Sequence, residues 1–306
     1  MRLCYHYCNV DIFISIIKNR LLRLSDINKS NDPQEGYRIF HGIFDYYASQ
    51  SWRGKYNENE MARLMDLVQE FNCEMRLFNG FNVYAMCFSE DGDLLSQWRG
   101  YTQDEAGISI GFDDSILNKW SLYHHNKRIA EFKRIEYLDG KRGIKWDFDR
   151  LIELSKNVDF SESIISAARL CHPFYRLLEE AAISGYYYKD TGFFEENESR
   201  LLYWEYYHSD DAHNLEFWKE SSSQAVNDKI SEFLLSEVKY HSWSKGFKKY
   251  YELSFEAVKD CLVREIIIGP KCAVSVKDVE EFLVREGYNV TGSDGIRVKK
   301  SKIHIC

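Results

Sequence analysis

Hydrophobic residues recur along the chain with two different spacings, and the first of these predicts helices. Near the N-terminus, apolar residues three and four positions apart follow Asn9, whose side chain is a favourable helix cap. A helix is therefore expected over Val10 to Asn19. The same spacing predicts further helices over residues 58–78, 147–156, 161–183, 215–238 and 276–286.

A separate helix start is expected at Asn31 to Glu35. Asp32 is the capping residue, Pro33 occupies the first helical position, and Glu35 completes a capping box. We expect the substitution Asp32→Ala to lower the free energy of unfolding by about 1 kcal/mol through loss of this cap.

The second spacing, short runs of β-branched and aromatic residues, predicts strands. These strands are expected over residues 5–7, 22–25, 82–89, 106–112, 129–137, 200–206, 263–268 and 296–305. Helices and strands are interspersed without a regular β-α-β alternation, which favours an α+β fold with a central mixed or antiparallel sheet and surrounding helices. No linker rich in Gly, Pro or Ser divides the chain, so one domain is expected over residues 1–306, with residues 147–183 as a helical insertion.

Composition and charge narrow the class of protein. The 40 Lys and Arg against 48 Asp and Glu give a net charge of −8, which argues against a general nucleic-acid coat but leaves room for a local basic patch. The N-terminus carries Arg2, His6, Asn9 and Asp11 among its apolar residues, so it does not resemble a signal peptide. The eight cysteines form no CxxC pair. We therefore expect a cytoplasmic protein without a zinc site, and no membrane partner.

No standard catalytic motif is present, and three weaker patterns could carry chemistry. The first is Tyr5-His6-Tyr7 on a short strand, followed by the strand that ends in Ser25. These strands could project polar groups into a cleft. The alternative is a buried histidine whose hydrogen bonds are satisfied between two packed tyrosines.

The second pattern is the aromatic pair Trp98 and Tyr101, which follows Ser89 and a polar turn. A spacing of three residues places both rings on one face of a helix, where they could stack on a nicotinamide or adenine ring. The alternative is that both rings belong to the core. We expect Trp98 to be buried and Tyr101 to reach the cleft, because Trp98 offers the larger apolar area to bury.

The third pattern is Glu196, Glu198 and Arg200. In a strand these alternate residues would share one face, and paired carboxylates beside a guanidinium suit acid–base work. The alternative is a solvated edge strand with a surface ion pair. We predict Glu198 as the essential carboxylate and Glu196 as its partner, with Glu195 pointing away.

The chain resembles a bacterial family of unknown function, known as domain of unknown function 2971. The resemblance rests on motifs spread over nearly the whole chain, namely Tyr5-His6-Tyr7, Leu24-Ser25, Asn31-Asp32-Pro33-x-Glu35, Cys87-Phe88-Ser89-Glu90, Trp98-x-x-Tyr101, Gly107-Ile108-Ser109-Ile110-Gly111-Phe112, Glu196-x-Glu198-x-Arg200 and Ile268-Gly269-Pro270. This family implies no activity.

A second resemblance, at the level of the fold, is to ADP-ribosyltransferases, and it implies a split sheet that binds NAD. By this resemblance His6 contacts the nicotinamide ribose, Ser89 or Tyr101 holds the nicotinamide, and Glu198 stabilises an oxocarbenium-like transition state. The remaining expected NAD-binding residues are Tyr7, Ser25, Trp98 and Arg200. The chain departs from these enzymes because it lacks the Ser-Thr-Ser motif on a middle strand.

The first hypothesis is therefore a NAD-dependent ADP-ribosyltransferase or NAD glycohydrolase. It would act as a bacterial toxin or phage-defence effector, with NAD as substrate and a protein or nucleic acid as acceptor. A fixed carboxylate stabilises the positive charge that develops on the ribose when the nicotinamide leaves. The hypothesis requires His6 and the segment with Glu196 and Glu198 to line the same cleft.

Two other classes of function stay open. One is a non-enzymatic nucleotide-binding or nucleic-acid-binding effector of a defence system, because single-stranded nucleic acid suits basic residues interleaved with aromatic ones. The residues concerned are Arg99, Lys127, Arg128, Lys133, Arg134, Lys245, Lys248 and Lys249, with Trp243, Phe247, Tyr250 and Tyr251. The other is a metal-dependent nuclease with Glu196, Glu198 and His208 as ligands, although their spacing matches no established metal site.

Overall fold

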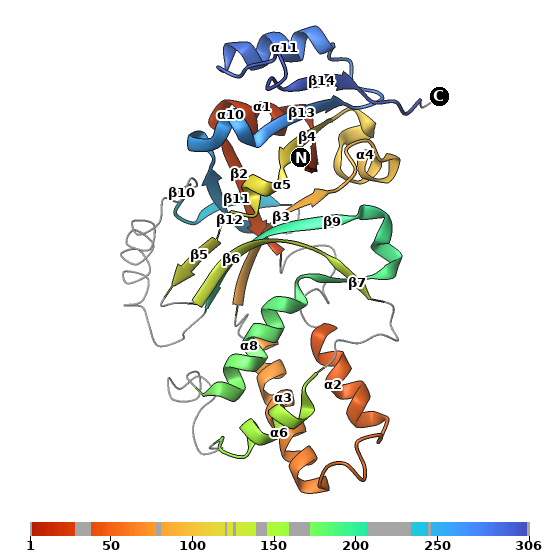
Figure 1. Ribbon diagram of the computed structural model, residues 1–306, viewed down its shortest axis with the longest axis vertical. Helices are drawn as coiled ribbons and strands as arrows, with labels where there is room; N and C mark the ends of the chain where they lie inside the picture. Colours follow the sequence, from red (N-terminus) through yellow and green to blue (C-terminus); the bar gives the residue numbers. More distant parts are fainter. Residues whose placement is uncertain are drawn as a thin grey trace.

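The computed structural model describes most of the chain, and Figure 1 shows its arrangement. The described residues are 2–27, 38–77, 81–119, 121–124, 127–138, 146–158, 172–206, 234–243 and 246–304. The helix start expected at Asp32 and most of the helix expected over residues 215–238 lie outside them. The fold is α+β, as the sequence predicts.

A twelve-stranded sheet forms the centre of the molecule. Its main path runs through β10 (Leu234–Leu235), β12 (Gly246–Ser254), β2 (Leu21–Asp26), β3 (Phe81–Ser89), β1 (Leu3–Cys8), β4 (Ile108–Asp113), β13 (Val263–Ile268) and β14 (Arg297–Lys300). Off this path, β11 (Lys239–Trp243) pairs with β12, while β9 (Glu198–Tyr206), β6 (Lys127–Arg134) and β5 (Ser121–His124) extend the sheet from β3. All of these pairings are antiparallel except that of β13 with β14.

The sheet forks beside β3. Strand β9 pairs with β3 along its whole length, from Ser89 to Phe81. The opposite edge of β3 is shared, since β1 pairs with it at Ser89 and β2 pairs with it at Ala85 and Tyr84. Strands β1 and β2 therefore diverge on either side of Cys87, which is in register with neither of them.

Helices cover the sheet in separate groups (Figure 1). Helix α1 (Val10–Asn19) begins at Asn9, as predicted, and buries Phe13, Ile16 and Ile17. Helix α4 (Leu95–Tyr101) contacts β1, and α11 (Val276–Arg285) contacts β14. Helices α2 (Arg38–Ala48), α3 (Glu58–Leu77), α6 (Phe148–Ser155) and α8 (Pro173–Gly185) gather at one end of the molecule. The short elements are α5 (Asp114–Leu117), α10 (Lys259–Leu262) and the 3-10 turns η2 (Gln103–Glu105), η3 (Thr191–Glu196) and η4 (Glu256–Val258).

Most predicted elements are found with ends shifted by a few residues, but two predictions are wrong. Glu196 does not belong to the strand of Glu198, because η3 ends at Glu196 and Asn197 adopts a left-handed backbone conformation with φ of 44°. Leu234 and Leu235 form a strand, β10, although a helix was expected there. The expected strand at 129–137 is divided into β6 and β7 (Glu136–Leu138), and β7 pairs with β8 (Tyr188–Asp190) in a separate small sheet.

Within the described residues, no helix is both long enough and apolar enough to span a membrane.

Candidate functional site

Strand register places several of the predicted site residues on one face of the sheet. Directly opposed residues of antiparallel strands project their side chains to the same side. Tyr5 opposes Ser89, and Ser89 opposes Glu198. Cys87 and Arg200 form the next such pair on this face, because alternate residues of a strand share a side. We call this side of the sheet the Glu198 face.

The centre of the Glu198 face is a buried ion pair. Arg200 donates from Nε to Oε1 of Glu198 at 2.6 Å and from one terminal nitrogen to Oε2 at 3.2 Å. Its other terminal nitrogen donates to the carbonyl oxygen of Tyr186 at 2.8 Å. Burial alone would raise the pKa of the Glu198 carboxyl, but the charges of Arg200 and Lys189 lower this pKa to about 2. Glu198 is therefore an ionised carboxylate that Arg200 binds in a bidentate manner.

Lys189 brings Glu196 to the same place. Its ammonium donates to Oε2 of Glu198 at 3.0 Å and forms a short contact with Oε2 of Glu196. The two glutamates thus lie together because both bind Lys189 of β8. They are not alternate residues of one strand, as the sequence had suggested. Burial raises the pKa of the Glu196 carboxyl although Lys189 acts in the opposite direction. Glu196 stays partly accessible, with 21% of its side chain exposed against 6% for Glu198.

The Tyr101 hydroxyl lies near this group, within the influence of the Glu196, Lys189 and Glu198 charges. Burial of its hydroxyl and the nearby charge of Glu196 raise its pKa. Its side chain nevertheless stays 52% exposed. Trp98 is fully buried, which confirms its predicted burial. The two rings have different neighbours, because Trp98 packs against Tyr7 with ring centroids 4.7 Å apart, whereas the Tyr101 hydroxyl lies near Glu196.

His6 lies on the opposite face from Glu198. It is one residue from Tyr5 in β1, and its ring lies edge-on to Phe88, which projects away from the Glu198 face. Nδ1 of His6 is 3.0 Å from the carbonyl oxygen of Cys87 at the fork. Burial lowers the pKa of His6, which favours the neutral ring. The arrangement that the NAD hypothesis requires, His6 and Glu198 in one cleft, is not found.

The other residues predicted to bind NAD serve the packing of the sheet or lie apart from Glu198. The Tyr7 hydroxyl donates to the carbonyl of Asp91 at 2.7 Å and accepts from the amide of Leu94 at 2.9 Å. Ser89 is buried and accepts from the amide of Asp91. Ser25 opposes Ala85 on β3, four residues along the strand from Ser89. Of the predicted set, the structure therefore brings together Ser89, Tyr101, Glu196, Glu198 and Arg200.

No metal centre is evident in the described part of the chain, where no group of three or more His, Cys, Asp and Glu is placed to hold an ion. Glu196 and Glu198 are held by Lys189 and Arg200, so these carboxylates already have cationic partners. His208, the third predicted ligand, lies outside the described residues.

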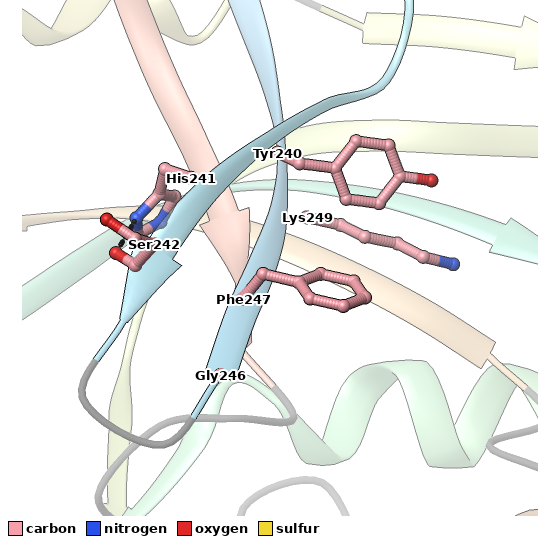
Figure 2. Close-up of a pocket in the computed structure, with 6 residues that line it drawn as sticks. All are labelled: Tyr240, His241, Ser242, Gly246, Phe247 and Lys249. Carbon is pink, nitrogen blue, oxygen red and sulfur yellow. Dashed lines mark hydrogen bonds between the residues drawn. The ribbon is translucent and has the colours of Figure 1, made fainter.

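A second candidate site is the hairpin of β11 and β12, which the sequence-based strand prediction missed. Tyr240 opposes Lys249, and Ser242 opposes Phe247, so Tyr240, Phe247 and Lys249 project to the same side. Figure 2 shows these three side chains extending together, whereas His241 points the other way. Tyr240 and Phe247 are 56% and 60% exposed, with ring centroids 5.6 Å apart. We call Tyr240, Phe247 and Lys249 the hairpin surface.

The hairpin surface borders an open hollow of about 670 Å³. The hollow is lined by Tyr240, His241, Ser242, Gly246, Phe247 and Lys249. The signal that could have revealed this hairpin from the sequence is the presence of aromatic residues on both sides of Gly246, with Tyr240 and Trp243 before it and Phe247, Tyr250 and Tyr251 after it.

The other basic residues considered for nucleic-acid binding do not join the hairpin surface. Arg99 pairs with Glu105, and Arg134 pairs with Glu90. Lys133 lies over the ring of Tyr187. The aromatic residue Tyr251 is buried and packs against Tyr84 and Tyr203, so it is a core residue. The side chains of Lys127, Arg128, Trp243 and Lys245 lie outside the described part of the chain.

Comparison with known proteins gives one match. Residues 97–201, about a third of the chain, match the model of a family described as "Protein of unknown function (DUF2971)". This range contains Tyr101, Lys189, Glu196, Glu198 and Arg200, and it ends before the hairpin surface. Searches of the curated proteins and of the solved structures found no significant match.

Proposed function

We propose that the protein binds single-stranded nucleic acid through the hairpin surface. The observation that carries this proposal is the pair of exposed rings, Tyr240 and Phe247, on the same side of the hairpin as Lys249. Bases of a single strand stack on exposed aromatic rings, and each such contact contributes about 1–3 kcal/mol to binding. An adjacent ammonium binds the phosphate between two stacked bases.

The charges around the hairpin favour binding of an anionic strand of nucleic acid over binding of an uncharged ligand. Within the described residues, no carboxylate pairs with Lys249. Lys239 is engaged by Glu252, and Arg23 lies over the ring of Tyr250 on the reverse side. The net charge of −8 repels a polyanion over the rest of the molecule. We therefore expect binding to be confined to a few nucleotides, with little preference for sequence.

The test is fluorescence anisotropy with a labelled 12-nucleotide oligothymidylate. Phe247→Ser and Tyr240→Ser should each weaken binding about tenfold, because each removes one stacking ring. Lys249→Gln should weaken binding and reduce the slope of log K against log salt concentration by about 0.7. A duplex of the same length should bind weakly, because its bases are already stacked.

Phe194→Ser is a matched control, since Phe194 is an equally exposed aromatic residue far along the chain from the hairpin. It should leave oligonucleotide binding unchanged. Equal loss in the Phe194 and Phe247 variants would indicate nonspecific adsorption and would refute the proposal, as would no measurable binding by the unaltered protein.

A NAD-cleaving enzyme is a second candidate, which Tyr101, Glu196 and the buried Glu198–Arg200 pair favour. In this version the accessible carboxylate, Glu196, faces the ribose and Glu198 positions the lysine that they share. His6 has no contact with the substrate. A role as a toxin or phage-defence effector belongs to this candidate, because cleavage of NAD would harm a cell.

The second candidate predicts release of nicotinamide from NAD by the purified protein. Glu196→Gln should abolish this release, whereas Glu195→Gln, which alters an exposed neighbour, should not. Absence of release, with and without cell extract as a source of acceptor, would exclude this candidate.

A further inference from the structure

We infer that a single strand of nucleic acid passes around the edge of β11, with its bases on the hairpin surface and its phosphates on three cations of the opposite face. The three cations are Arg23, Lys239 and Lys248, and we call them the cation group. The inference rests on the proposed function and adds a second contact surface to it.

The register of the strands gathers the cation group on one face. Lys239 and Lys248 are each adjacent in sequence to a residue of the hairpin surface. Successive residues of a strand project to opposite faces, so both lysines lie on the face opposite the hairpin surface. Arg23 comes from β2, and it opposes Glu252, which shares the face of Lys248 because alternate residues of β12 project to the same side. The cation group therefore occupies three neighbouring strands, β11, β12 and β2.

Arg23 is held in a position to bind a phosphate. Its guanidinium lies over the ring of Tyr250, 4.3 Å from the centroid, while the residue as a whole is exposed. His241 lies edge-on to the same ring, with centroids 5.5 Å apart. Among the described residues, no carboxylate forms an ion pair with Arg23. A guanidinium that stacks on a ring keeps its N–H groups at its rim, where they can bind phosphate oxygens in a bidentate manner.

The balance of charge on this face favours an anion. Glu252 is the one carboxylate that β2, β11 and β12 place there, against the three cations. Its hydrogen bond with Lys239 raises the pKa of that lysine, whereas the nearby charge of Arg23 lowers it, so the two cations lie close together. The face therefore carries a net positive charge although the whole chain carries −8. A chain of phosphates is attracted to such a patch.

The edge of β11 connects the two faces over a short path. Among the described residues, β11 pairs only with β12, so its other edge borders no described strand. Crossing this edge requires the width of one strand, about 5 Å. The lining of the open hollow includes His241 together with Tyr240, Phe247 and Lys249, so the hollow reaches residues of both faces (Figure 2). A few nucleotides therefore suffice to reach from the exposed rings to the cation group.

Fluorescence anisotropy with two labelled probes, measured over a range of salt concentrations, tests the inference. One probe is the oligothymidylate, and the other is an abasic strand of the same length, which keeps the phosphates and lacks the bases. Arg23→Gln and Lys239→Gln should each reduce the slope of log K against log salt concentration by about 0.7 for both probes. Phe247→Ser should weaken binding of the oligothymidylate about tenfold and leave binding of the abasic strand unchanged.

Lys277→Gln is the matched control, because it makes the same change in net charge on α11, where 82% of the Lys277 side chain is exposed. It should alter neither slope. Thermal melts establish that each variant is folded. If Arg23→Gln does not fold, Lys239→Gln decides, since Lys239 lies on an edge strand with 45% of its side chain exposed.

The results separate failure of this inference from failure of the hairpin function. Oligothymidylate binding that depends on Phe247 but keeps its full salt slope in the Arg23 and Lys239 variants would overturn the inference and leave the hairpin function intact. Binding of two strands per protein molecule would also overturn it, because each face would then hold its own strand. No binding of either probe by the unaltered protein would refute both proposals.

Discussion

His6 and Glu198 contact the same residue, Cys87, from opposite faces of the sheet. Nδ1 of His6 is 3.0 Å from the Cys87 carbonyl oxygen, and the Cys87 thiol forms a hydrogen bond with the Glu198 carboxylate. The contact lies at the fork, where β1 and β2 separate along the edge of β3. Cys87 therefore links the histidine on one face of the sheet to the ion pair on the other.

The Glu198–Arg200 pair is expected to be essential for folding. Glu198→Gln leaves a fully buried guanidinium without its charged partner, and breaking a buried ion pair typically costs about 3–5 kcal/mol. Chemical denaturation should show a loss of this size. Glu195→Gln, on the exposed surface, should change the free energy of unfolding by less than about 0.5 kcal/mol. A Glu198→Gln variant as stable as the unaltered protein would show that the pair is not structural.

Stability should fall in acid because of Glu198. Its pKa is about 2 in the folded protein and 4.5 ordinarily, so the unfolded chain binds a proton more readily. The stabilisation is complete above pH 4.5 and is lost as the pH falls from about 4.5 to 2, with a slope of up to about 1.4 kcal/mol per pH unit. Denaturation curves over this range measure it.

Glu196 acts in the opposite sense, because its pKa is raised in the folded protein. Its contribution lies above pH 4.5, so the acid series is repeated with Glu196→Gln, in which the loss of stability between about pH 4.5 and 2 should be retained. If the acid dependence disappears in the Glu196→Gln variant, it arises from Glu196 and not from Glu198.

His6 is expected to titrate below its ordinary pKa of 6.5, because burial disfavours the charged ring. Since the folded-state pKa is lowered, the neutral ring contributes full stability above pH 6.5 and loses it as the pH falls below that value. Nuclear magnetic resonance of ring-labelled histidines, with His6→Gln for assignment, measures the midpoint. A midpoint at or above 6.5 would be inconsistent with the buried contact to Cys87.

The cap of α1 offers a local test of stability. Asn9 accepts a hydrogen bond from the amide of Ile12 at 2.8 Å. Asn9→Ala should lower the free energy of unfolding by about 1 kcal/mol. Asn19→Ala, at the exposed end of the same helix, is the matched control and should have a smaller effect. Equal losses in both variants would indicate a general effect on the helix and not a cap.

The sequence alone determined the features that depend on neighbouring residues. Apolar spacing and the Asn9 cap specified α1, and the apolar run Val263 to Ile268 specified β13, because helix and strand periodicity are local properties. The burial of Trp98 and the accessibility of Tyr101 also followed from local context. The alternation of Glu198 and Arg200 placed them on one face because both lie in β9.

Only the tertiary structure decided which distant residues meet. Glu196 joins Glu198 through Lys189, a residue of another strand, although a left-handed turn at Asn197 removes Glu196 from β9. His6 is separated from Glu198 because the pairing of β1 with β3 begins at Tyr5, and a shift of one residue would have reversed its face. Strand register depends on contacts between segments far apart in the chain, which no local pattern encodes.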